Sequence, residues 1–425
     1  MTTGTALLTD QYELTMLQAA LASGAAHRRA VFEVFARRLP GGRRYGVVAG
    51  TGRFLDALED FRFDEQDIDY LCSAGIVDEP TGEFLAGYRF SGNVYGYREG
   101  EAFFPGSPIM VVEGTFAEAV LLETLILSIL NHDCAIAAAA SRMAQAAGDR
   151  PLIEMGSRRT HEHAAVAAAR AAYLCGFAST SNLMAGHLYG VPTAGTAAHA
   201  FTLLHDSEED AFRAQLDSLG RGTTLLVDTY DVAKAVRTAV ELAGPGLGAV
   251  RIDSGDLAVV AVEVRRLLDE LGADRTRIVV TSDLDEFAIA ALAAAPVDAY
   301  GVGTALSTGS GHPTASLVYK LVAREDHAGV LQPVAKASVG KPSVGGRKWA
   351  YRRTSGGTAT AEVVTREPMD ADDRPLLAEL VRDGKVVGRE PLEAARDRHR
   401  ATLTELPLEA CSLSPGDPAV PTIFK

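Results

Sequence analysis

The sequence has few cysteines, and they lie far apart. Its 425 residues include four, with no Cys-x-x-Cys pair and no spacing typical of a metal site: Cys72, Cys134, Cys175 and Cys411. Cys134 and Cys175 have apolar neighbours, where buried free thiols are usual. Scattered free thiols fit a reducing compartment, so we expect a cytoplasmic protein.

Long apolar runs and an excess of basic side chains are also lacking. The most apolar stretch, residues 119–130, contains Glu123 and is too short to span a bilayer. The N-terminus has no basic region followed by an apolar run, so we expect no signal peptide. The formal net charge of −14 argues against sequence-independent binding of nucleic acid or anionic membranes, because phosphate contacts need clustered Lys and Arg.

The composition that is present is that of a globular protein. An apolar fraction of 47% excludes a wholly disordered chain, and the length predicts two to three domains. Residues 1–117 mix helix and strand: Asp10 and Glu13 predict a capping box at a helix start, and strands are expected near 31–35 and 93–97. We expect an N-terminal α+β domain here.

Residues 118–335 have a different pattern. Helical stretches at 118–131 and 134–147 are followed by short apolar strands that alternate with helices, which predicts βαβ units and a parallel sheet. A polar residue ends nearly every strand: Glu154, Thr196, Asp228, Asp253, Asp283 and Thr304. Polar ends on many strands favour a (β/α)8-type barrel over an open doubly wound sheet, which concentrates its functional groups at one switch point.

Residues 336–425 form a third segment. They contain a strand-like stretch at 348–351 and a hairpin signal at 382–385. We expect this C-terminal segment to pack on the N-terminal domain.

A glycine-rich loop, residues 301–311, follows the last clear strand. Glycines let backbone N–H groups approach an oxyanion closely, and barrel enzymes often hold a phosphate in their last loops. Gly303 and Thr304 are therefore candidate phosphate ligands. The alternative is a flexible surface loop.

Charged residues follow two earlier strands. Arg251 and Asp253 project from the same face of one strand and suit an anionic group, ribose hydroxyls and Mg²⁺, although an internal ion pair at a helix N-cap is the structural alternative. Arg158 and Arg159 follow Glu154 at a helix start and suit pyrophosphate. Local context does not assign a role to His199.

Five segments together resemble the nicotinate phosphoribosyltransferase family of type II phosphoribosyltransferases. They occur in the family's order between residue 8 and about 320, and read Leu8-Thr9-Asp10-Gln11-Tyr12-Glu13, Gly156-Ser157-Arg158-Arg159-Thr160-His161, Gly195-Thr196-Ala197-Ala198-His199, Arg251-Ile252-Asp253-Ser254-Gly255-Asp256 and Gly301-Val302-Gly303-Thr304. The resemblance implies an irregular (β/α)8-type barrel with an additional α+β sheet domain formed from the N- and C-terminal parts. It also implies a homodimer with shared active sites.

The resemblance further implies roles for individual residues. His199 corresponds to the histidine that ATP phosphorylates, Arg251 to the partner of the nicotinate carboxylate, and Asp253 to a ligand of ribose hydroxyls or Mg²⁺. Tyr12 is expected to stack on the pyridine ring from the partner subunit. The remaining residues expected to bind substrate are Thr196 near nicotinate, Arg158 and Arg159 at pyrophosphate, Gly303 and Thr304 at the 5′-phosphate, and Arg142, Ser282 and Asp283, which lie in matching regions.

The implied activity is formation of nicotinate mononucleotide and pyrophosphate from nicotinate and phosphoribosyl pyrophosphate, with Mg²⁺ and coupled ATP hydrolysis, in NAD biosynthesis. A nicotinamide-specific enzyme is the first alternative; residues 176–199 contain no Asp or Glu to accept from an amide, which favours the anionic substrate. Quinolinate would need more cations for its two carboxylates. A catalytically silent nucleotide sensor of the same fold is the remaining alternative.

Overall fold

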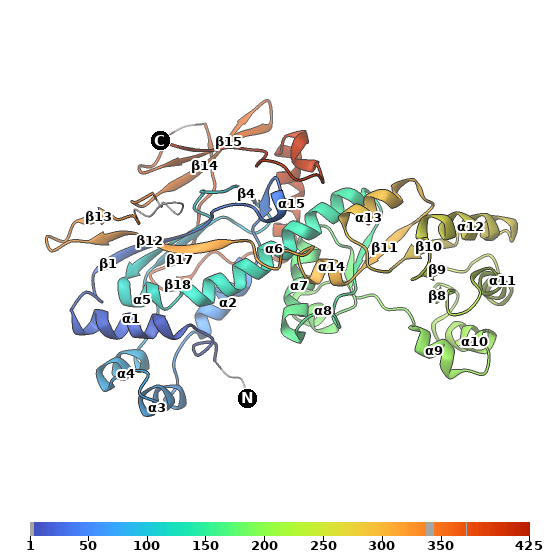
Figure 1. The fold of residues 1–425 in the computed structure, drawn as a ribbon, viewed down its shortest axis with the longest axis horizontal. Helices are drawn as coiled ribbons and strands as arrows, with labels where there is room; N and C mark the ends of the chain where they lie inside the picture. The colour runs from blue at the N-terminus through green and yellow to red at the C-terminus, as the bar shows by residue number, and fades with distance from the viewer. Residues whose placement is uncertain (1–3, 337–343, 371) are drawn as a thin grey trace. The chain divides into compact units, whose positions relative to one another are not determined.

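The computed structural model describes residues 4–336, 344–370 and 372–425 (Figure 1). Contacts divide the chain into two compact units. One comprises residues Met1–Ala138 and His312–Lys425, and the other comprises Ala139–Gly311. The first unit is thus built from both ends of the chain. The predicted domain bounds, 1–117, 118–335 and 336–425, stay a prediction.

The first unit is organised around a seven-stranded antiparallel sheet. Its order is β13 (Leu331–Pro333), β12 (Leu317–Glu325), β1 (Arg29–Ala36), β5 (Met110–Thr115), β3 (Asn93–Gly96), β17 (Ala378–Arg382) and β18 (Lys385–Val386). Because β1 lies between β12 and β5, and β17 pairs with β3, one sheet combines N- and C-terminal strands. The additional sheet domain formed from both ends of the chain is therefore confirmed.

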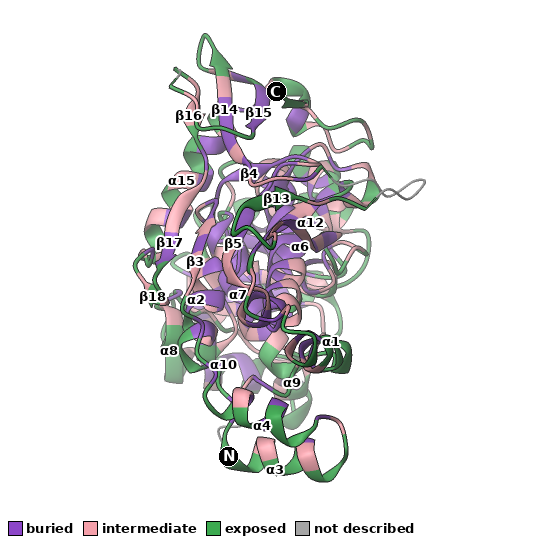
Figure 2. Ribbon diagram, turned by 90° about the vertical axis from the view of Figure 1, so that its left-hand side faces the viewer, coloured by how far each residue is buried: buried purple, intermediate pink, exposed green. Residues whose placement is uncertain are grey.

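Helices cover this sheet and complete the core. They are α1 (Gln11–Ala22), α2 (Thr51–Asp60), α3 (Glu65–Ser73), α4 (Glu79–Ala86), α5 (Phe116–Val120), α15 (Leu392–Glu405) and residues 123–138 of α6 (Glu123–Ala147), whose remaining residues belong to the second unit. The rings of Phe32 and Tyr319, on adjacent strands, stack with centroids 4.7 Å apart. In Figure 2, α6 is largely coloured as buried, whereas α3 is coloured mostly as exposed.

The start of α1 differs from the prediction. The Asp10 side chain makes no capping hydrogen bond, so the predicted capping box is wrong. Glu13 is buried instead, and its carboxylate accepts a hydrogen bond from the Thr124 backbone N–H at 2.8 Å. Asp10 and Glu13, whose spacing indicated a capping box, therefore do not form one. Glu13 instead joins α1 to the start of α6.

The two predicted helices at 118–131 and 134–147 are largely one continuous helix, α6. The stretch Phe116–Ala147 is long and apolar enough to cross a membrane by those two criteria alone, and 67% of its most apolar window is buried inside the protein. Cys134 lies on this helix, fully buried and without a disulfide, as expected. These properties are those of the core helix of a globular fold.

Two small sheets complete the first unit. One contains β16 (Arg374–Pro375), β14 (Trp349–Ser355), β15 (Thr358–Thr365) and β19 (Thr422–Phe424), and the other pairs β2 (Gly46–Val47) with β4 (Ala102–Phe103). The predicted hairpin at 382–385 is confirmed, because Arg382 pairs with Lys385 across it. Asp383 and Gly384 both have positive φ, 47° and 72°, as a two-residue hairpin turn requires.

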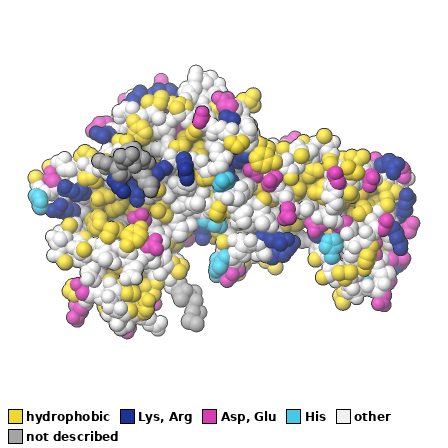
Figure 3. Space-filling view, in the orientation of Figure 1, with side chains coloured by type: hydrophobic (Ala, Val, Ile, Leu, Met, Phe, Trp, Pro, Cys, Tyr) yellow, Lys and Arg dark blue, Asp and Glu magenta, His cyan; other side chains and the backbone are white. Residues whose placement is uncertain are grey.

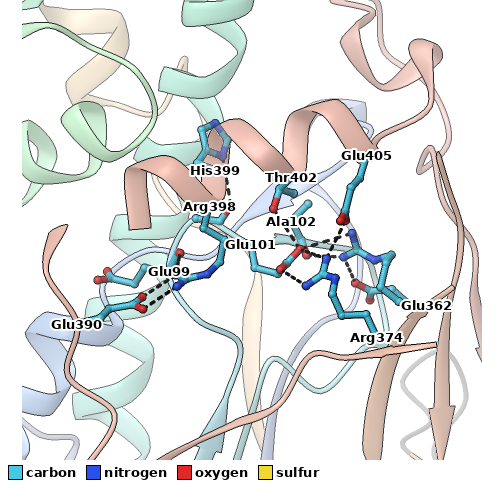
Figure 4. Close-up of polar contacts among 12 residues, drawn as sticks. Glu99, Glu101, Ala102, Glu362, Arg374, Glu390, Arg398, His399, Thr402 and Glu405 are labelled. Atoms are coloured by element: carbon cyan, nitrogen blue, oxygen red, sulfur yellow. Dashed lines mark hydrogen bonds and ion pairs between the residues drawn. The ribbon is translucent and has the colours of Figure 1, made fainter. Parts of the chain in front are cut away.

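A network of ion pairs joins α15 to the strands of this unit (Figure 4). Arg352 is fully buried and donates to the buried Glu362 at 2.7 Å, and the partly exposed Arg374 donates to Glu101 at 2.8 Å. Arg374 also reaches Glu405 on α15 at 2.8 Å. The Arg352–Glu362 pair is costly to break singly, because the remaining charge stays buried without that partner.

The second unit contains a curled parallel sheet of six strands. Its order is β7 (Ser179–Thr180), β6 (Leu152–Glu154), β11 (Ala299–Val302), β10 (Arg277–Val280), β9 (Ala249–Ile252) and β8 (Thr224–Leu226). An isolated parallel bridge from Thr180 to Thr193 extends its β7 edge. The predicted α/β class with an irregular barrel-type sheet is confirmed, and the six strands are fewer than the eight of a closed barrel.

Helices alternate with these strands. They are α7 (Glu162–Leu174), α8 (Leu183–Tyr189), α9 (His199–Leu204), α10 (Glu208–Leu219), α11 (Val232–Ala243), α12 (Leu257–Glu270), α13 (Glu286–Ala291) and α14 (Thr304–Ser307). Asp231, Asp256 and Asp285 each cap the following helix through a side-chain oxygen. Asp256, which ends the family segment that starts at Arg251, is therefore the N-cap of α12. On the face shown in Figure 3, basic and acidic side chains are interspersed.

His399 on α15 makes the stability of the protein depend on pH. Its side chain is buried, Nδ1 lies 3.3 Å from the Gly100 carbonyl oxygen, and burial lowers its pKa from 6.5 to about 4. The unfolded chain binds this proton more tightly, so the contribution of neutral His399 is complete above pH 6.5 and is lost as the pH falls towards 4. The loss is on the order of 3 kcal/mol.

We expect His399→Gln to flatten this part of the pH dependence. The free energy of unfolding, from urea titrations at pH 7 and pH 5, should fall less in the variant than in the wild type. His187→Gln is the matched control, since His187 is exposed. An equal fall in H399Q and the wild type would contradict the assignment.

Candidate active site

A cavity of about 630 Å³ lies in the second unit, at the carboxyl ends of its parallel strands. Its lining includes nine of the residues singled out from the sequence: Arg158, Arg159, Thr196, Arg251, Asp253, Ser282, Asp283, Gly303 and Thr304. These residues come from loops after several different strands. The fold therefore gathers at one site residues that are about 150 positions apart, as expected for a barrel-type sheet.

Arg251 is the cation that extends from the sheet itself. It lies on β9, and its Nη1 donates a hydrogen bond to Thr196 Oγ1. Its Nε is buried and has no hydrogen-bond partner in the part of the chain that the structure describes. Burial lowers the pKa of this guanidinium, and the nearby charge of Arg158 acts in the same direction, while Asp253 and Asp228 oppose them. An anionic ligand would satisfy the free donor and the charge together.

Two carboxylates lie beside Arg251. Asp253 accepts a hydrogen bond from Thr281 Oγ1, across from β9 to the end of β10. Asp228, after β8, has a nearly inaccessible side chain, and its Oδ2 accepts from the Asp253 backbone N–H at 2.9 Å and from Ser254 Oγ at 2.6 Å. Asp228 therefore fixes the loop that carries Asp253.

His199 begins α9 and faces these carboxylates. Its Nδ1 lies 3.2 Å from Thr229 Oγ1, and its Nε2 lies 3.9 Å from Asp228 Oδ1 and 4.0 Å from Asp253 Oδ2. The side chain is 39% exposed, so a ring nitrogen is accessible to a ligand. Asp228 Oδ1 is buried and has no hydrogen-bond partner among the described residues, which leaves an acceptor beside the imidazole.

Arg158 and Arg159 stand on a turn between β6 and α7. Both are exposed, and neither makes an ion pair with a carboxylate within the described ranges. The Arg159 backbone N–H donates to the Gly156 carbonyl oxygen at 2.8 Å, which closes the turn. The two guanidiniums are thus free to bind an anion in the cavity.

The glycine-rich loop approaches this turn. A Cβ on Gly303 would lie 3.3 Å from the Met155 carbonyl oxygen, so glycine permits the close packing of the two segments. Thr304 follows at the exposed start of α14. The first part of the glycine-rich loop therefore lines the cavity.

Ser282 has a strained backbone at the edge of the cavity. Its φ is 142°, a region that side chains other than glycine rarely adopt. The neighbouring Asp283 is exposed and also lines the cavity. Strain of this kind persists only where the surroundings impose it, and it concentrates at functional sites.

Three of the twelve singled-out residues are not part of the cavity lining: His199, which lies beside Asp253, and Arg142 and Tyr12. Arg142 is on α6, nearly buried, and its Nε donates to Glu286 Oε1 at 3.0 Å. Tyr12 is on α1 of the first unit, 45% exposed, with its pKa raised by burial and by the carboxylates of Glu123 and Glu13. Their expected substrate contacts stay predictions.

Sequence reasoning did not include Asp228, Thr229 or Thr281 in the site. The sequence pattern identified Asp228 only as a polar residue at the end of a strand. The hydrogen bonds that these side chains make to His199 and Asp253 join separate loops, which local sequence does not reveal. No cluster of three or more His, Cys, Asp or Glu able to hold a metal occurs among the described residues.

Several known proteins are similar to this chain in sequence and fold. The model of the nicotinate phosphoribosyltransferase N-terminal domain matches residues 7–131. Nicotinate phosphoribosyltransferase of Mycobacterium tuberculosis is 59% identical over 429 aligned positions, which cover 98% of this chain and 94% of that protein. The chain belongs to the nicotinate phosphoribosyltransferase family.

Two solved structures extend the family likeness to the whole fold. Human nicotinic acid phosphoribosyltransferase aligns with a TM-score of 0.84 at 27% identity, over 98% of this chain and 97% of that chain. Nicotinate-nucleotide pyrophosphorylase of Pyrococcus furiosus aligns with a TM-score of 0.78 at 25% identity, over 95% and 96%. The family predicted from the five sequence segments is confirmed.

Substitution of Ser282 tests whether its backbone is strained. Ser282→Gly removes the penalty for positive φ, whereas Ser282→Ala retains it and removes only the hydroxyl. We expect the glycine variant to exceed the alanine variant in free energy of unfolding by about 1 kcal/mol. Urea denaturation of both variants measures the difference, and a glycine variant less stable than the alanine variant would show that no strain is stored at this position.

Proposed function

We propose that this chain is a nicotinate phosphoribosyltransferase that forms nicotinate mononucleotide and pyrophosphate from nicotinate and phosphoribosyl pyrophosphate, with Mg²⁺ and coupled ATP hydrolysis. The observation that carries the proposal is the half-buried Arg251, hydrogen-bonded to Thr196, in one cavity with the unpaired Arg158 and Arg159. A single cation and a separate pair of cations match one carboxylate and one pyrophosphate. The family's activity, in NAD biosynthesis, uses these substrates.

Nicotinate is proposed to bind with its carboxylate at Arg251. The buried Nε of this guanidinium and the Thr196 hydroxyl offer donors to a planar anion. Nicotinamide carries an amide at the same position, which would leave the charge of Arg251 uncompensated. Residues 176–199, which include Thr196, contain no Asp or Glu that would accept from an amide.

Phosphoribosyl pyrophosphate is proposed to occupy the rest of the cavity. Arg158 and Arg159 are positioned for its pyrophosphate, and Gly303 and Thr304 for its 5′-phosphate. Asp253 is positioned for the ribose hydroxyls, with Ser282 and Asp283 on the same rim. Separate sites for the two charged ends would hold C1 of the ribose near the ring of nicotinate.

The reaction needs electrostatic stabilisation more than proton transfer. The pyridine nitrogen of nicotinate forms a bond to C1 as the bond from C1 to the pyrophosphate oxygen breaks, and the leaving group takes the electron pair. Positive charge develops on the ribose and negative charge on pyrophosphate. Arg158 and Arg159 would stabilise the negative charge in a site where fixed donors need no rearrangement.

The carboxylates at the cavity suit Mg²⁺ that binds together with phosphoribosyl pyrophosphate. Mg²⁺ is usually held by one or two carboxylates, with substrate phosphates and water as the other ligands. Asp253 has a partly exposed side chain and lines the same cavity as Arg158 and Arg159. When bound, the ion supplies charge neutralisation for pyrophosphate, and Asp253 is the residue that would hold it.

ATP is proposed to phosphorylate His199. The γ-phosphoryl group would move to a ring nitrogen as ADP leaves, and hydrolysis of the phosphohistidine would later release phosphate. A phosphoryl group adds a charge of about −1.5 to −2. Because Asp228 and Asp253 lie within 4.0 Å of Nε2, this charge would repel both carboxylates and rearrange the cavity between tight and weak substrate binding.

The assembled enzyme is proposed to be a cytoplasmic homodimer with shared active sites. Tyr12 would stack on the pyridine ring from the partner subunit, and its exposure on α1 leaves the phenol ring accessible. Arg142 is also proposed to bind substrate, and its Nε donates to Glu286 on α13. The silent-sensor alternative is less consistent with the presence of Arg251, Asp253 and His199 together at one site.

A side-by-side assay tests the substrate assignment. Purified protein is incubated with phosphoribosyl pyrophosphate, Mg²⁺ and either nicotinate, nicotinamide or quinolinate, with and without ATP, and products are separated by chromatography. We expect turnover of nicotinate, stimulated by ATP. Turnover of nicotinamide but not of nicotinate would overturn the assignment of the nicotinate carboxylate to Arg251. If none of the three pyridine substrates is converted, the result would support a catalytically silent nucleotide sensor.

Replacement of His199 tests the coupling to ATP. We expect His199→Ala to abolish ATP stimulation and incorporation of label from γ-³²P-ATP, while a slow ATP-independent reaction remains. His161→Ala is the matched control, because His161 is an exposed histidine of the same unit. ATP stimulation that survives in H199A would show that the phosphohistidine is formed elsewhere or not at all.

A further inference from the structure

A buried carboxyl group lies behind the turn that carries Arg158 and Arg159. Glu154 is the last residue of β6, its side chain is fully buried, and burial raises its pKa. Among the described residues it makes no ion pair. Burying a carboxyl group without a cation is costly. The hydrogen bonds that Glu154 makes therefore indicate which parts of the structure it stabilises.

Both oxygens of Glu154 are used as acceptors. Oε1 accepts from the backbone N–H of Gly156, and Oε2 accepts from Thr180 Oγ1 on the neighbouring strand β7. Thr180 Oγ1 in turn accepts from the Asn182 backbone N–H at 2.9 Å. The carboxyl thus connects the first residue of the arginine turn to the loop that follows β7.

The same loop returns to the turn through Asn182. Its Nδ2 donates to Ser157 Oγ at 3.0 Å, and its Oδ1 caps α8 through the Ala185 backbone N–H at 2.9 Å. Hydrogen bonds therefore connect Glu154, Thr180, Asn182 and Ser157 in series, and the Gly156–Ser157 backbone closes the ring at Glu154; we call it the β6–β7 ring. Each side chain in the ring is fixed by at least one other member.

The turn is also confined by packing on its other side. Gly156 has no room for a side chain, because a Cβ would overlap Ser307 Oγ and lie 2.9 Å from Glu154 Oε1. Ser307 Oγ lies 3.4 Å from the Gly156 carbonyl oxygen and 3.3 Å from that of Gly303. The arginine turn and the glycine-rich loop are therefore fixed against one another.

We propose that Glu154 is a positioning residue, which acts through the β6–β7 ring to hold Arg158 and Arg159 in the geometry that binds the pyrophosphate of phosphoribosyl pyrophosphate. This inference rests on the proposed function. Glu154 does not line the cavity and touches no substrate in this assignment. Because Glu154 already restricts the turn, Arg158 and Arg159 lose less conformational freedom when the anion binds.

Kinetic constants separate positioning from a general loss of structure. We expect Glu154→Ala to raise KM for phosphoribosyl pyrophosphate about tenfold, equivalent to about 1.4 kcal/mol, with KM for nicotinate changed less than twofold. Glu154→Gln retains the shape and one acceptor and should recover most of the loss. Val264→Ala, a buried position on α12 outside the ring, is the control for destabilisation alone.

Ser157→Ala is the second variant, which removes one bond at the partly exposed end of the ring. It should raise KM for phosphoribosyl pyrophosphate about threefold, even if E154A does not fold. Unchanged KM for phosphoribosyl pyrophosphate in E154A, or in S157A where E154A is insoluble, would overturn the proposal. An equal rise in both KM values would also overturn it.

A binding measurement distinguishes failure of this inference from failure of the proposed function. Calorimetric titration with inorganic pyrophosphate and Mg²⁺ requires no turnover. If the wild type converts none of the pyridine substrates, the proposed function fails, while weaker pyrophosphate binding in E154A and S157A than in V264A still supports the positioning role. Equal affinity in all of these proteins would contradict it.

Discussion

Parallel pairing in the second unit is the constraint on which the site depends. Val279 pairs with Arg251, and Val302 pairs with Glu154, so the strands β6, β9, β10 and β11 end at the same edge. Every loop that leaves this edge begins within reach of the others. Arginines, carboxylates and glycines from distant parts of the chain therefore meet without any one loop having to be long.

Two buried carboxyl groups near the cavity, Glu154 and Asp228, accept hydrogen bonds from neutral donors. Glu154 accepts from an N–H and a hydroxyl, and Asp228 does the same. If either formed an ion pair with an arginine of the cavity, it would neutralise the charge that an anionic substrate needs. Neutral donors hold the carboxyl groups in place and leave the guanidiniums free for a ligand.

The sequence was sufficient for features that are repeated or local. Alternating strands and helices predicted the parallel sheet, and the hairpin at 382–385 follows from the backbone preferences of Asp383 and Gly384. The cavity lining was predictable because strand ends share one edge. The failed capping box at Asp10 and the roles of Asp228 and Thr281 share a cause: each depends on a partner distant in sequence, Glu13 at Thr124 and Asp228 at Asp253.

The arginines at the cavity differ from those buried in the first unit. In the first unit, Arg352, Arg374 and Arg398 each contact at least one glutamate at 2.6–2.8 Å; Arg352 joins β14 to β15, and Arg374 on β16 also reaches Glu405 on α15. At the cavity of the second unit, Arg158, Arg159 and Arg251 have no carboxylate within ion-pair distance in the described ranges. They outnumber the two acidic residues of the cavity lining, Asp253 and Asp283, although the whole chain carries a net charge of −14. Because low-dielectric walls strengthen the field of fixed charges, this local excess of arginine favours an anionic ligand at the cavity of an acidic protein.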